Sequence, residues 1–222
     1  PFSVKHYNTN TVPWYEYISG NLPDYPVEVL HANSRLLDQQ LARLRSAHGD
    51  PRVWDTVEQI NDYPDSLSMQ IDGYAIHAWQ EFCPVYFESL VQLQWGAPMH
   101  ISHGGFQHAT LRYFSSESHR PGLPQGLSAL VSGLEPDEAT VTLANTTDST
   151  HALVIQAGAF GEHTITEVSE TSQTAEALTA PSAWLEIEMP AQASVTLRLR
   201  LDRYSNKPSY ETPWSRRQDW SP

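Results

Sequence analysis

Cysteine is almost absent from the sequence, since Cys83 is its single cysteine, and this excludes an intrachain disulfide. Cys83 lies in an apolar run without a cationic neighbour, which favours a buried hydrophobic residue over a reactive thiolate. Basic residues are also few: 13 Lys and Arg stand against 26 Asp and Glu, for a formal net charge of -13 at pH 7. Because nucleic acids and anionic membranes are bound through basic patches, this balance argues against both as partners.

Long apolar segments and short reaction-defining motifs are missing as well. No apolar run approaches membrane-spanning length and no signal peptide is visible, so we expect a cytoplasmic protein. The sequence has no nucleophile elbow, P-loop, CxxC pair or dinucleotide-binding fingerprint. These absences argue against serine hydrolases, NTPases and nicotinamide enzymes. A functional prediction must therefore rest on clusters of residues that are less specific than these motifs.

Aromatic residues, by contrast, are plentiful, with 7 Trp and 10 Tyr in 222 residues. Trp14, Tyr15 and Tyr17 form a dense cluster near the start of the sequence, with Asn and Glu residues nearby. Rings that stack on sugars, next to polar groups that bind hydroxyls, suit carbohydrate ligands, so we predict that these three residues bind substrate. The same cluster could instead be a packing strap or an interface with another chain.

Helical patterns dominate the first half of the sequence. Apolar residues recur at helical spacing over residues 24–47, where Asp24 can cap the first turn. A second helical stretch is expected at about 74–95, with a kink or a break at Pro84. Residues 1–25 are expected to be irregular, because prolines and Asn-Thr pairs interrupt any periodicity.

Strand patterns dominate the second half. Short strands are predicted at about 109–114, 139–143, 152–157, 163–168, 184–189 and 194–201. The polar turn between the second and third of these strands predicts a hairpin. It contains Asn145, Thr146 and Thr147, which fit a glycosylation acceptor, although a strand turn is the simpler interpretation. Residues 169–182 are expected to be an exposed loop, and 204–222 an extended strap that packs back.

Together these patterns predict an α+β fold, with a helical N-terminal half followed by an antiparallel β-sandwich. We place the boundary between residues 1–108, which are helical and rich in aromatic residues, and residues 109–222, which hold the sandwich and the strap. No internal repeat is evident.

Three histidines, His100, His103 and His108, lie close together at this boundary. Imidazole is a preferred ligand of zinc, copper and iron, so we predict that these residues hold a divalent transition metal. His103 is also predicted to act in catalysis. The spacing matches no established metal motif, and the histidines could instead cap the junction of the two halves by hydrogen bonding.

A further cluster, His77, Glu81 and Glu88, falls in the second helical stretch. His77 and Glu81 stand four residues apart and share a helix face, and Glu88 lies seven residues beyond Glu81. Glycoside hydrolases use two carboxylates, one as acid and one as base or nucleophile. We therefore predict that Glu81 and Glu88 are catalytic and that His77 contacts substrate, although a solvated helix face has the same composition.

The segment from Gln156 to His163 contains Gly158 and Gly161, but it lacks the lysine and the following helix of a phosphate loop. We expect a β-bulge or a tight connection between strands at this position. Glu162 and His163 are adjacent at the bend and form a weak candidate for a functional pair.

Four segments resemble parts of uncharacterised bacterial proteins, in which similar stretches occupy the C-terminal portion. They cover residues 10–17, 100–105, 156–163 and 206–210, with the pair Pro213-Trp214 close behind. The resemblance implies a fragment or a subunit and carries no activity. More loosely, helices followed by a β-sandwich resemble the C-terminal end of many carbohydrate-active enzymes.

We therefore expect a part or a subunit of a carbohydrate-processing protein, of the glycoside hydrolase or lyase type. It would bind a carbohydrate ligand in a cleft between its helical and β halves. Two alternatives stay open. One is a non-catalytic interaction subunit that docks on a larger protein partner or forms an oligomer, and the other is a metal-dependent enzyme that uses the three histidines.

Overall fold

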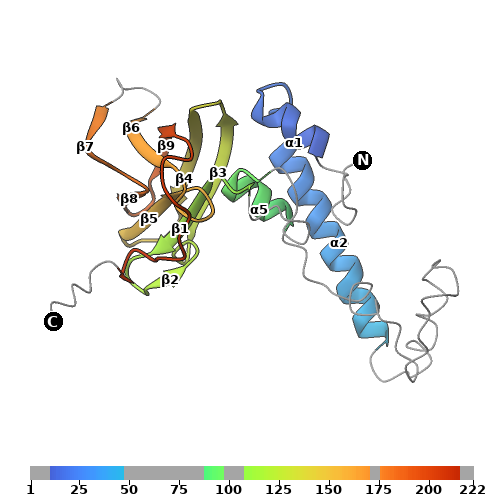
Figure 1. Cartoon of the computed structure of the whole chain (residues 1–222). Coiled ribbons are helices and arrows are strands. Elements are labelled where there is room, and N and C mark those ends of the chain that lie inside the picture. The colour runs from blue at the N-terminus through green and yellow to red at the C-terminus, as the bar shows by residue number, and fades with distance from the viewer. Residues whose placement is uncertain (1–10, 48–87, 98–107, 171–175, 216–222) are drawn as a thin grey trace, which may run out of the picture.

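The computed structural model describes residues 11–47, 88–97, 108–170 and 176–215 (Figure 1). Within these ranges the helices precede the strands, and every strand pair is antiparallel. The helices are α1 (Thr11–Ile18), α2 (Tyr25–Ala47) and α5 (Glu88–Trp95). The α+β class, with helices followed by two antiparallel sheets, is therefore confirmed.

Nine strands of the described residues form the two sheets. The first sheet has the order β2-β1-β5-β8 and contains β1 (Leu111–Ser115), β2 (Arg120–Pro121), β5 (His151–Ala157) and β8 (Trp184–Met189). The second has the order β3-β4-β9-β6-β7 and contains β3 (Leu127–Leu134), β4 (Glu138–Asn145), β6 (Thr164–Glu170), β7 (Glu176–Ser182) and β9 (Ser194–Asp202). The chain therefore passes between the sheets several times.

The two sheets share one hydrophobic core. Burial alternates along the strands, most regularly along β4, where every second side chain from Ala139 to Asn145 is buried. Leu143 of the second sheet and Leu153 and Ile155 of the first are fully buried in the same cluster. Because alternate residues point inward, the other half of each strand forms an outer face that is free to make different contacts.

Three features of the sheets differ from the prediction. Strand β3 was not expected, because Ser128, Ser132 and Gly133 interrupt its apolar pattern. Strand β7 lies within the stretch 169–182 that was predicted to be a loop, and its pairing with β6 outweighs its small, polar sequence. The predicted hairpin is wrong, because β4 and β5 belong to different sheets and the polar turn after Asn145 carries the chain between them.

The helices have a small core of their own. Trp14 and Tyr17 of α1 pack with Tyr25 of α2 and Leu93 of α5. The Tyr25 hydroxyl donates a hydrogen bond to Gln92 Oε1 at 2.9 Å, so this core also contains a buried polar contact. The aromatic residues near the start of the sequence therefore hold the helices together.

The predicted helix over residues 24–47 is confirmed by α2. The prediction that residues 1–25 are irregular is wrong for Thr11–Ile18, which form α1 because a helix places its aromatic residues against α2. Helix α5 is the last part of the second helical stretch, and Pro84 lies outside the described residues. None of the described helices is both long and apolar enough to cross a membrane.

Helix α5 joins the helices to the sheets and lies between α2 and β3 (Figure 1). The Tyr113 hydroxyl donates a hydrogen bond to the backbone carbonyl of Gln94 at 2.6 Å. Gly96 ends the helix with a φ of 61°, and a Cβ at this position would lie only 3.0 Å from Val131 Cγ1. The helices are thus packed closely on the sheets, and the predicted boundary at residue 108 stays a prediction.

Candidate functional site

The outer face of the first sheet carries a row of polar and aromatic side chains. Arg112 on β1, Gln156 on β5 and Trp184 on β8 are direct neighbours across the three strands. Strand alternation places them on this face, because Ile155 and Ala157 on either side of Gln156 are buried in the core between the sheets. The row is therefore well placed to contact whatever covers the sheet.

The chain after β9 crosses this face, and we call residues 204–215 the C-terminal strap (Figure 1). The rings of Tyr210 and Phe160 meet edge to face, with centroids 5.4 Å apart. Trp214 packs edge to face on Phe114, which lies on β1, at 5.8 Å. The predicted strap is thus confirmed over these residues, and the rest of the predicted segment lies outside the described residues.

The turn between β5 and β6 is built around a buried carboxylate. Glu162 accepts hydrogen bonds from the backbone N–H groups of Ala159 at 3.2 Å and Phe160 at 2.7 Å. Gly158 and Gly161 have φ values of 87° and 68°, and a Cβ at Gly158 would collide with the Glu162 carboxylate. The predicted tight connection between strands is confirmed, and both glycines serve the turn.

Arg112 links the row on the sheet to this turn. Its Nη1 donates a hydrogen bond to the backbone carbonyl of Ala159 at 2.6 Å, and its guanidinium lies 5.2 Å from the centre of the Phe114 ring. Burial lowers the pKa of Arg112, and the negative charge of Glu162 opposes that shift. The positive side chain therefore stabilises the turn that encloses Glu162.

His163 fastens the strap to the same turn. Its ring is buried, and Nδ1 accepts the backbone N–H of Tyr204 at 3.0 Å. In the neutral ring the proton is therefore on Nε2, which lies 4.0 Å from Glu162 Oε1. Burial lowers the pKa of His163, while the charge of Glu162 opposes the shift and Arg203 adds to it. The neutral imidazole is thus the form that holds the strap.

Asn206 completes the attachment of the strap. Its Nδ2 donates to the backbone carbonyls of Gly161 at 3.2 Å and His163 at 3.0 Å, and it lies 3.0 Å from Thr164 Oγ1. The backbone N–H of Asn206 donates to the carbonyl of Glu162 at 3.2 Å. A single residue of the strap is therefore bonded to four consecutive residues, from Gly161 to Thr164, at the end of the turn.

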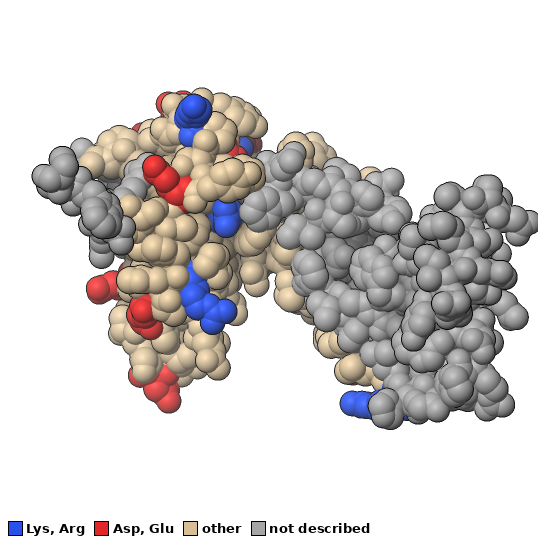
Figure 2. Space-filling model, turned by 60° about the horizontal axis from the view of Figure 1, so that its bottom comes forward, with Lys and Arg blue, Asp and Glu red and all other residues tan. Residues whose placement is uncertain are grey.

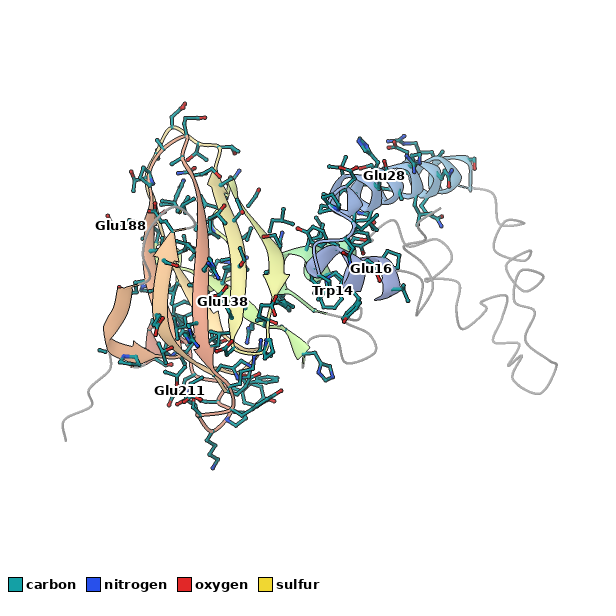
Figure 3. The ribbon with its side chains drawn as sticks, turned by 90° about the horizontal axis from the view of Figure 1, so that it is seen from above. Trp14, Glu16, Glu28, Glu138, Glu188 and Glu211 are labelled. Atoms are coloured by element: carbon teal, nitrogen blue, oxygen red, sulfur yellow. The ribbon has the colours of Figure 1, made fainter. Side chains whose placement is uncertain are left out.

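A pocket of about 640 Å³ lies between the strap, the turn and the start of β8, and we call it the strap pocket. Its walls combine aromatic rings, small side chains and hydrogen-bonding groups from Phe160, Gly161, Thr164, Pro181, Ser182, Ala183, Trp184, Asn206, Lys207, Pro208, Ser209 and Glu211. Figure 3 shows Glu211 at an end of the sheets that lies away from the helices. The volume suits a small-molecule ligand.

The aromatic cluster that was predicted to bind substrate lies elsewhere. Trp14 and Tyr17 are buried in the helical core, and burial raises the pKa of Tyr17 to about 12. Tyr15, on the same helix, is 61% exposed. Trp14 lies well apart from Glu211 of the strap pocket (Figure 3). Trp14 and Tyr17 therefore pack within the protein, which was the alternative interpretation of this cluster. A sugar contact by the cluster stays a prediction.

Four of the other predicted site residues lie outside the described residues: His77, Glu81, His100 and His103. Glu88 is the first residue of α5, but the structure describes only its backbone. His108 is exposed and precedes β1. In the part of the chain that the structure describes, no three His, Cys, Asp or Glu residues are grouped so that they could hold a metal. The catalytic and metal assignments therefore stay predictions.

The strap pocket was missed in the sequence because its residues come from three distant segments. Trp184 follows a stretch that was predicted to be a loop, and Asn206 lies beyond the last strand. Two signals pointed to its parts: the glycine-containing bend at Glu162 and His163, and the resemblance over residues 206–210. Neither signal showed that the turn and the strap lie side by side.

A hydroxyl, an imidazole and a carboxylate also line up at the other end of β5. His151 Nε2 lies 3.0 Å from Thr147 Oγ1, and Nδ1 lies 3.3 Å from Glu117 Oε1. The order is that of a hydrolytic triad. However, Thr147 Oγ1 is also 2.8 Å from Asn145 Oδ1, within a turn that the asparagine side chain organises, so its one proton has a nearer acceptor. We interpret this group as a turn cap.

Charge does not mark out a binding surface on the face that Figure 2 shows. Basic and acidic side chains are interspersed over the described part of this face, without a patch of one sign. Two ion pairs on the second sheet are exposed, Arg198 with Glu138 at 2.8 Å and Arg200 with Asp137 at 2.9 Å, and exposed pairs of this kind contribute little to stability. The strap pocket is therefore distinguished by its shape and chemistry.

Comparison with protein families matches residues 1–91 to a domain of unknown function (DUF8034), which is less than half of the chain. No curated protein matches. The chain is similar to the structure of a proposed alpha-N-acetylgalactosaminidase from Bacillus halodurans, at 20% identity and a TM-score of 0.30, over 41% of this chain and 21% of that one. It is also similar to alpha-galactosidase I from Mortierella vinacea, at 16% identity and a TM-score of 0.28, over 37% and 23%. The chain spans only these small shares of both enzymes, and such distant likeness says nothing of its activity.

Proposed function

We propose that the two sheets form a β-sandwich module of a carbohydrate-processing protein, and that this module binds a saccharide in the strap pocket. The observation that carries the proposal is the composition of the pocket. Trp184 and Phe160 supply aromatic rings, and Ser209 and Glu211 supply hydroxyl and carboxylate groups beside them, while the Asn206 amide nitrogen is used to hold the wall itself. A sugar ring presents both an apolar face and a rim of hydroxyls, and it needs both kinds of partner.

The site is built to hold its ligand in one place. The turn wall is fixed by the Glu162 carboxylate, and the strap wall is fixed to it by Asn206 and His163. Trp184 is supported by Phe114, whose ring centroid lies 5.4 Å away. Walls that are ordered before binding reduce the entropy lost when a ligand binds, which favours recognition of a specific small molecule.

We assign binding, without hydrolysis, to the strap pocket. Glycoside hydrolysis uses two carboxyl groups on either side of the scissile bond. Among the described residues that line the pocket, Glu211 is the single carboxylate. Glu162 lies behind the wall, where its oxygens accept backbone N–H groups of the turn. Any catalytic pair, including the predicted Glu81 and Glu88, would have to lie in another part of the protein.

Titration of the chain with neutral sugars tests the proposal. D-glucose, D-galactose, D-mannose and N-acetyl-D-glucosamine would be added to isotopically labelled protein, and amide chemical shifts would be followed by NMR. We expect at least one sugar to shift residues around Trp184 and Asn206 in a saturable way. Trp184→Ala should abolish this binding. Tyr15→Ala is the matched control, because Tyr15 is exposed on α1 and belongs to the predicted aromatic cluster.

The two variants separate two locations for a sugar. Loss of binding in Trp184→Ala with retention in Tyr15→Ala supports the strap pocket. The opposite pattern would place the sugar on the helices, as the aromatic pattern of the sequence predicts. If none of the four sugars binds to the wild-type chain, the saccharide proposal is wrong.

An interaction subunit is the second candidate. Val12 and Tyr15 on α1 and Val27 on α2 are 68%, 61% and 58% exposed, and all three belong to the first two helices. We propose that this part of the helices contacts another protein chain. Sedimentation velocity of the wild-type chain and of Val12→Ser/Val27→Ser tests self-association. A monomeric wild-type chain would exclude a homo-oligomer formed through this surface.

A further inference from the structure

We infer that Tyr210 forms a second sugar-binding position beside the strap pocket, so that the ligand of this module is an oligosaccharide and not a single sugar. The inference rests on the proposed function and names the class of ligand. It depends on the exposure of the Tyr210 ring, on its place next to the pocket wall and on the way in which the backbone around it is held.

Tyr210 is unusually exposed for an aromatic residue. It is 91% exposed, and Tyr204, also on the C-terminal strap, is 78% exposed. Among the large hydrophobic residues that the structure describes, these two are the most exposed. A side chain that buries so little of its surface gains little from packing, so packing does not account for an aromatic ring at residue 210.

Tyr210 lies immediately beside the strap pocket. The residues on either side of it, Ser209 and Glu211, both line the pocket, whereas Tyr210 is not part of the lining. Its ring meets the ring of Phe160 edge to face, with centroids 5.4 Å apart, and Phe160 also lines the pocket. The exposed ring therefore lies one side chain away from the pocket, next to its wall.

The backbone on both sides of Tyr210 is held in place. The backbone N–H of Ser209 donates a hydrogen bond to the carbonyl of Phe160 at 2.9 Å, which joins the strap to the turn. The hydroxyl of Ser209 accepts the backbone N–H of Glu211 at 3.1 Å. Because these bonds fix the strap around Tyr210, little further order is lost when a ligand contacts its ring, which favours binding.

A sugar is the ligand that suits an exposed tyrosine at this place. The tyrosine ring has an apolar face and a hydroxyl at its tip, and a sugar ring presents the matching apolar face and rim of hydroxyls. A monosaccharide held in the pocket would not cover Tyr210, because Tyr210 lies outside the lining. A second sugar unit linked to the first can extend along the strap and stack on the exposed ring.

The helices leave this end of the sheets open. Figure 3 shows Glu211, the next residue along the chain after Tyr210, at the end of the sheets that lies away from Trp14 and Glu28 of the helices. A longer saccharide can therefore pass the strap without meeting α1 or α2. The position is also distinct from the exposed surface of these two helices.

Disaccharides test the inference. For each of D-glucose, D-galactose, D-mannose and N-acetyl-D-glucosamine that binds to the wild-type chain, its α- and β-linked disaccharides would be titrated into the same protein, for example maltose and cellobiose for D-glucose. We expect at least one disaccharide to bind roughly three- to tenfold more tightly than its monosaccharide, the value of one additional stacking contact.

Variants of the two exposed tyrosines then locate the second sugar unit. Tyr210→Ala should make the dissociation constants of the two ligands equal, and Tyr210→Phe should preserve the difference, because the face of the ring is kept. Tyr204→Ala is the matched control and should also preserve it, since the Tyr204 ring packs on His163, which does not line the pocket. Comparing two ligands on one protein cancels any general loosening of the strap by a substitution.

The outcomes separate this inference from the proposed function. If a monosaccharide binds and none of its disaccharides binds more tightly, the inference is wrong and the proposed function stands. If Tyr210→Ala retains the tighter binding of the disaccharide, or if Tyr204→Ala loses it, the second unit does not depend on Tyr210 alone and the inference is also wrong. If the wild-type chain binds none of the four monosaccharides, both the proposed function and the inference fall.

Discussion

Asn145 is expected to be the most sensitive polar residue of the two sheets. It ends β4 at the point where the chain leaves the second sheet, and it is 3% exposed. Its Nδ2 lies 2.8 Å from Ser149 O, 3.1 Å from Met189 O and 2.9 Å from Pro190 O. Its Oδ1 accepts the backbone N–H of Thr147 at 2.9 Å. One side chain therefore joins the end of β4, the turn and the end of β8.

The cost of Asn145→Ala follows from these contacts. The substitution removes two or three effective hydrogen bonds at about 1 kcal/mol each and leaves the carbonyl of buried Met189 without this donor at about 1–3 kcal/mol. We therefore expect a loss of about 3–5 kcal/mol in the free energy of unfolding. For a chain of this size, the melting temperature should fall by about 6–20 °C. Because the amide is buried and bonded, Asn145 is also expected to resist glycosylation in the folded chain.

Urea unfolding followed by tryptophan fluorescence measures this loss. Asn145→Asp should destabilise the fold as well, because the carboxylate keeps the acceptor and replaces the donor with a charge that faces carbonyl oxygens. Thr150→Ala is the control, since Thr150 is an exposed residue of the same turn and should stay within about 0.5 kcal/mol of the wild-type value. An Asn145→Ala protein that unfolds within about 1 kcal/mol of the control would refute this account of the junction between the sheets.

Three further predictions concern the strap, the turn and the helices. The stabilising contribution of neutral His163 should be complete above its ordinary pKa of about 6.5 and should decline as the pH falls below it, because burial lowers the pKa in the folded chain. His163→Gln should flatten this slope in urea unfolding. Gly158→Ala should cost more than about 2 kcal/mol in the same assay, because of its φ of 87° and the collision with Glu162. Tyr25→Phe should cost about 1–2 kcal/mol by loss of its bond to Gln92.

Each of these predictions has a clear counter-result. If the free energy of unfolding changes equally with pH in the wild-type and His163→Gln proteins, protonation of His163 does not cause the loss of stability at low pH. Gly122→Ala, in an open turn with a φ of 104°, is the control for backbone strain alone, and Gly158→Ala must be the more costly of the two. Tyr25→Phe without any loss would mean that water replaces the hydroxyl in the helical core.

Local patterns in the sequence were sufficient for the elements whose burial repeats with a simple period. Helix α2 follows its spaced leucines, and β4 follows a strict alternation of apolar residues. The glycines at residues 158 and 161 correctly indicated a tight turn, because positive φ is a local property of the backbone. In each case the information lies within about ten neighbouring residues.

The remaining features depend on contacts between distant residues. Strand β7 pairs with β6, and the aromatic residues of α1 pack on α2, although neither segment has a clear pattern of its own. The strap pocket depends on Asn206 meeting Gly161 and on Trp184 lying beside Gln156. A single sequence carries no record of such pairings, so it predicted the elements better than the candidate site.

The course of the strap also has a consequence for the order in which the chain matures. The strap follows β9, so a ribosome releases it only after every strand of both sheets has been synthesised. Until then the ring of Phe114, which is 1% exposed in the finished fold, would have Trp184 and Arg112 beside it but would lack the cover that Trp214 gives it. Newly synthesised chains in which the strap has not yet docked expose apolar surface that chaperones or other such chains can bind. Docking of the strap therefore covers this apolar surface in the same step that forms the strap pocket.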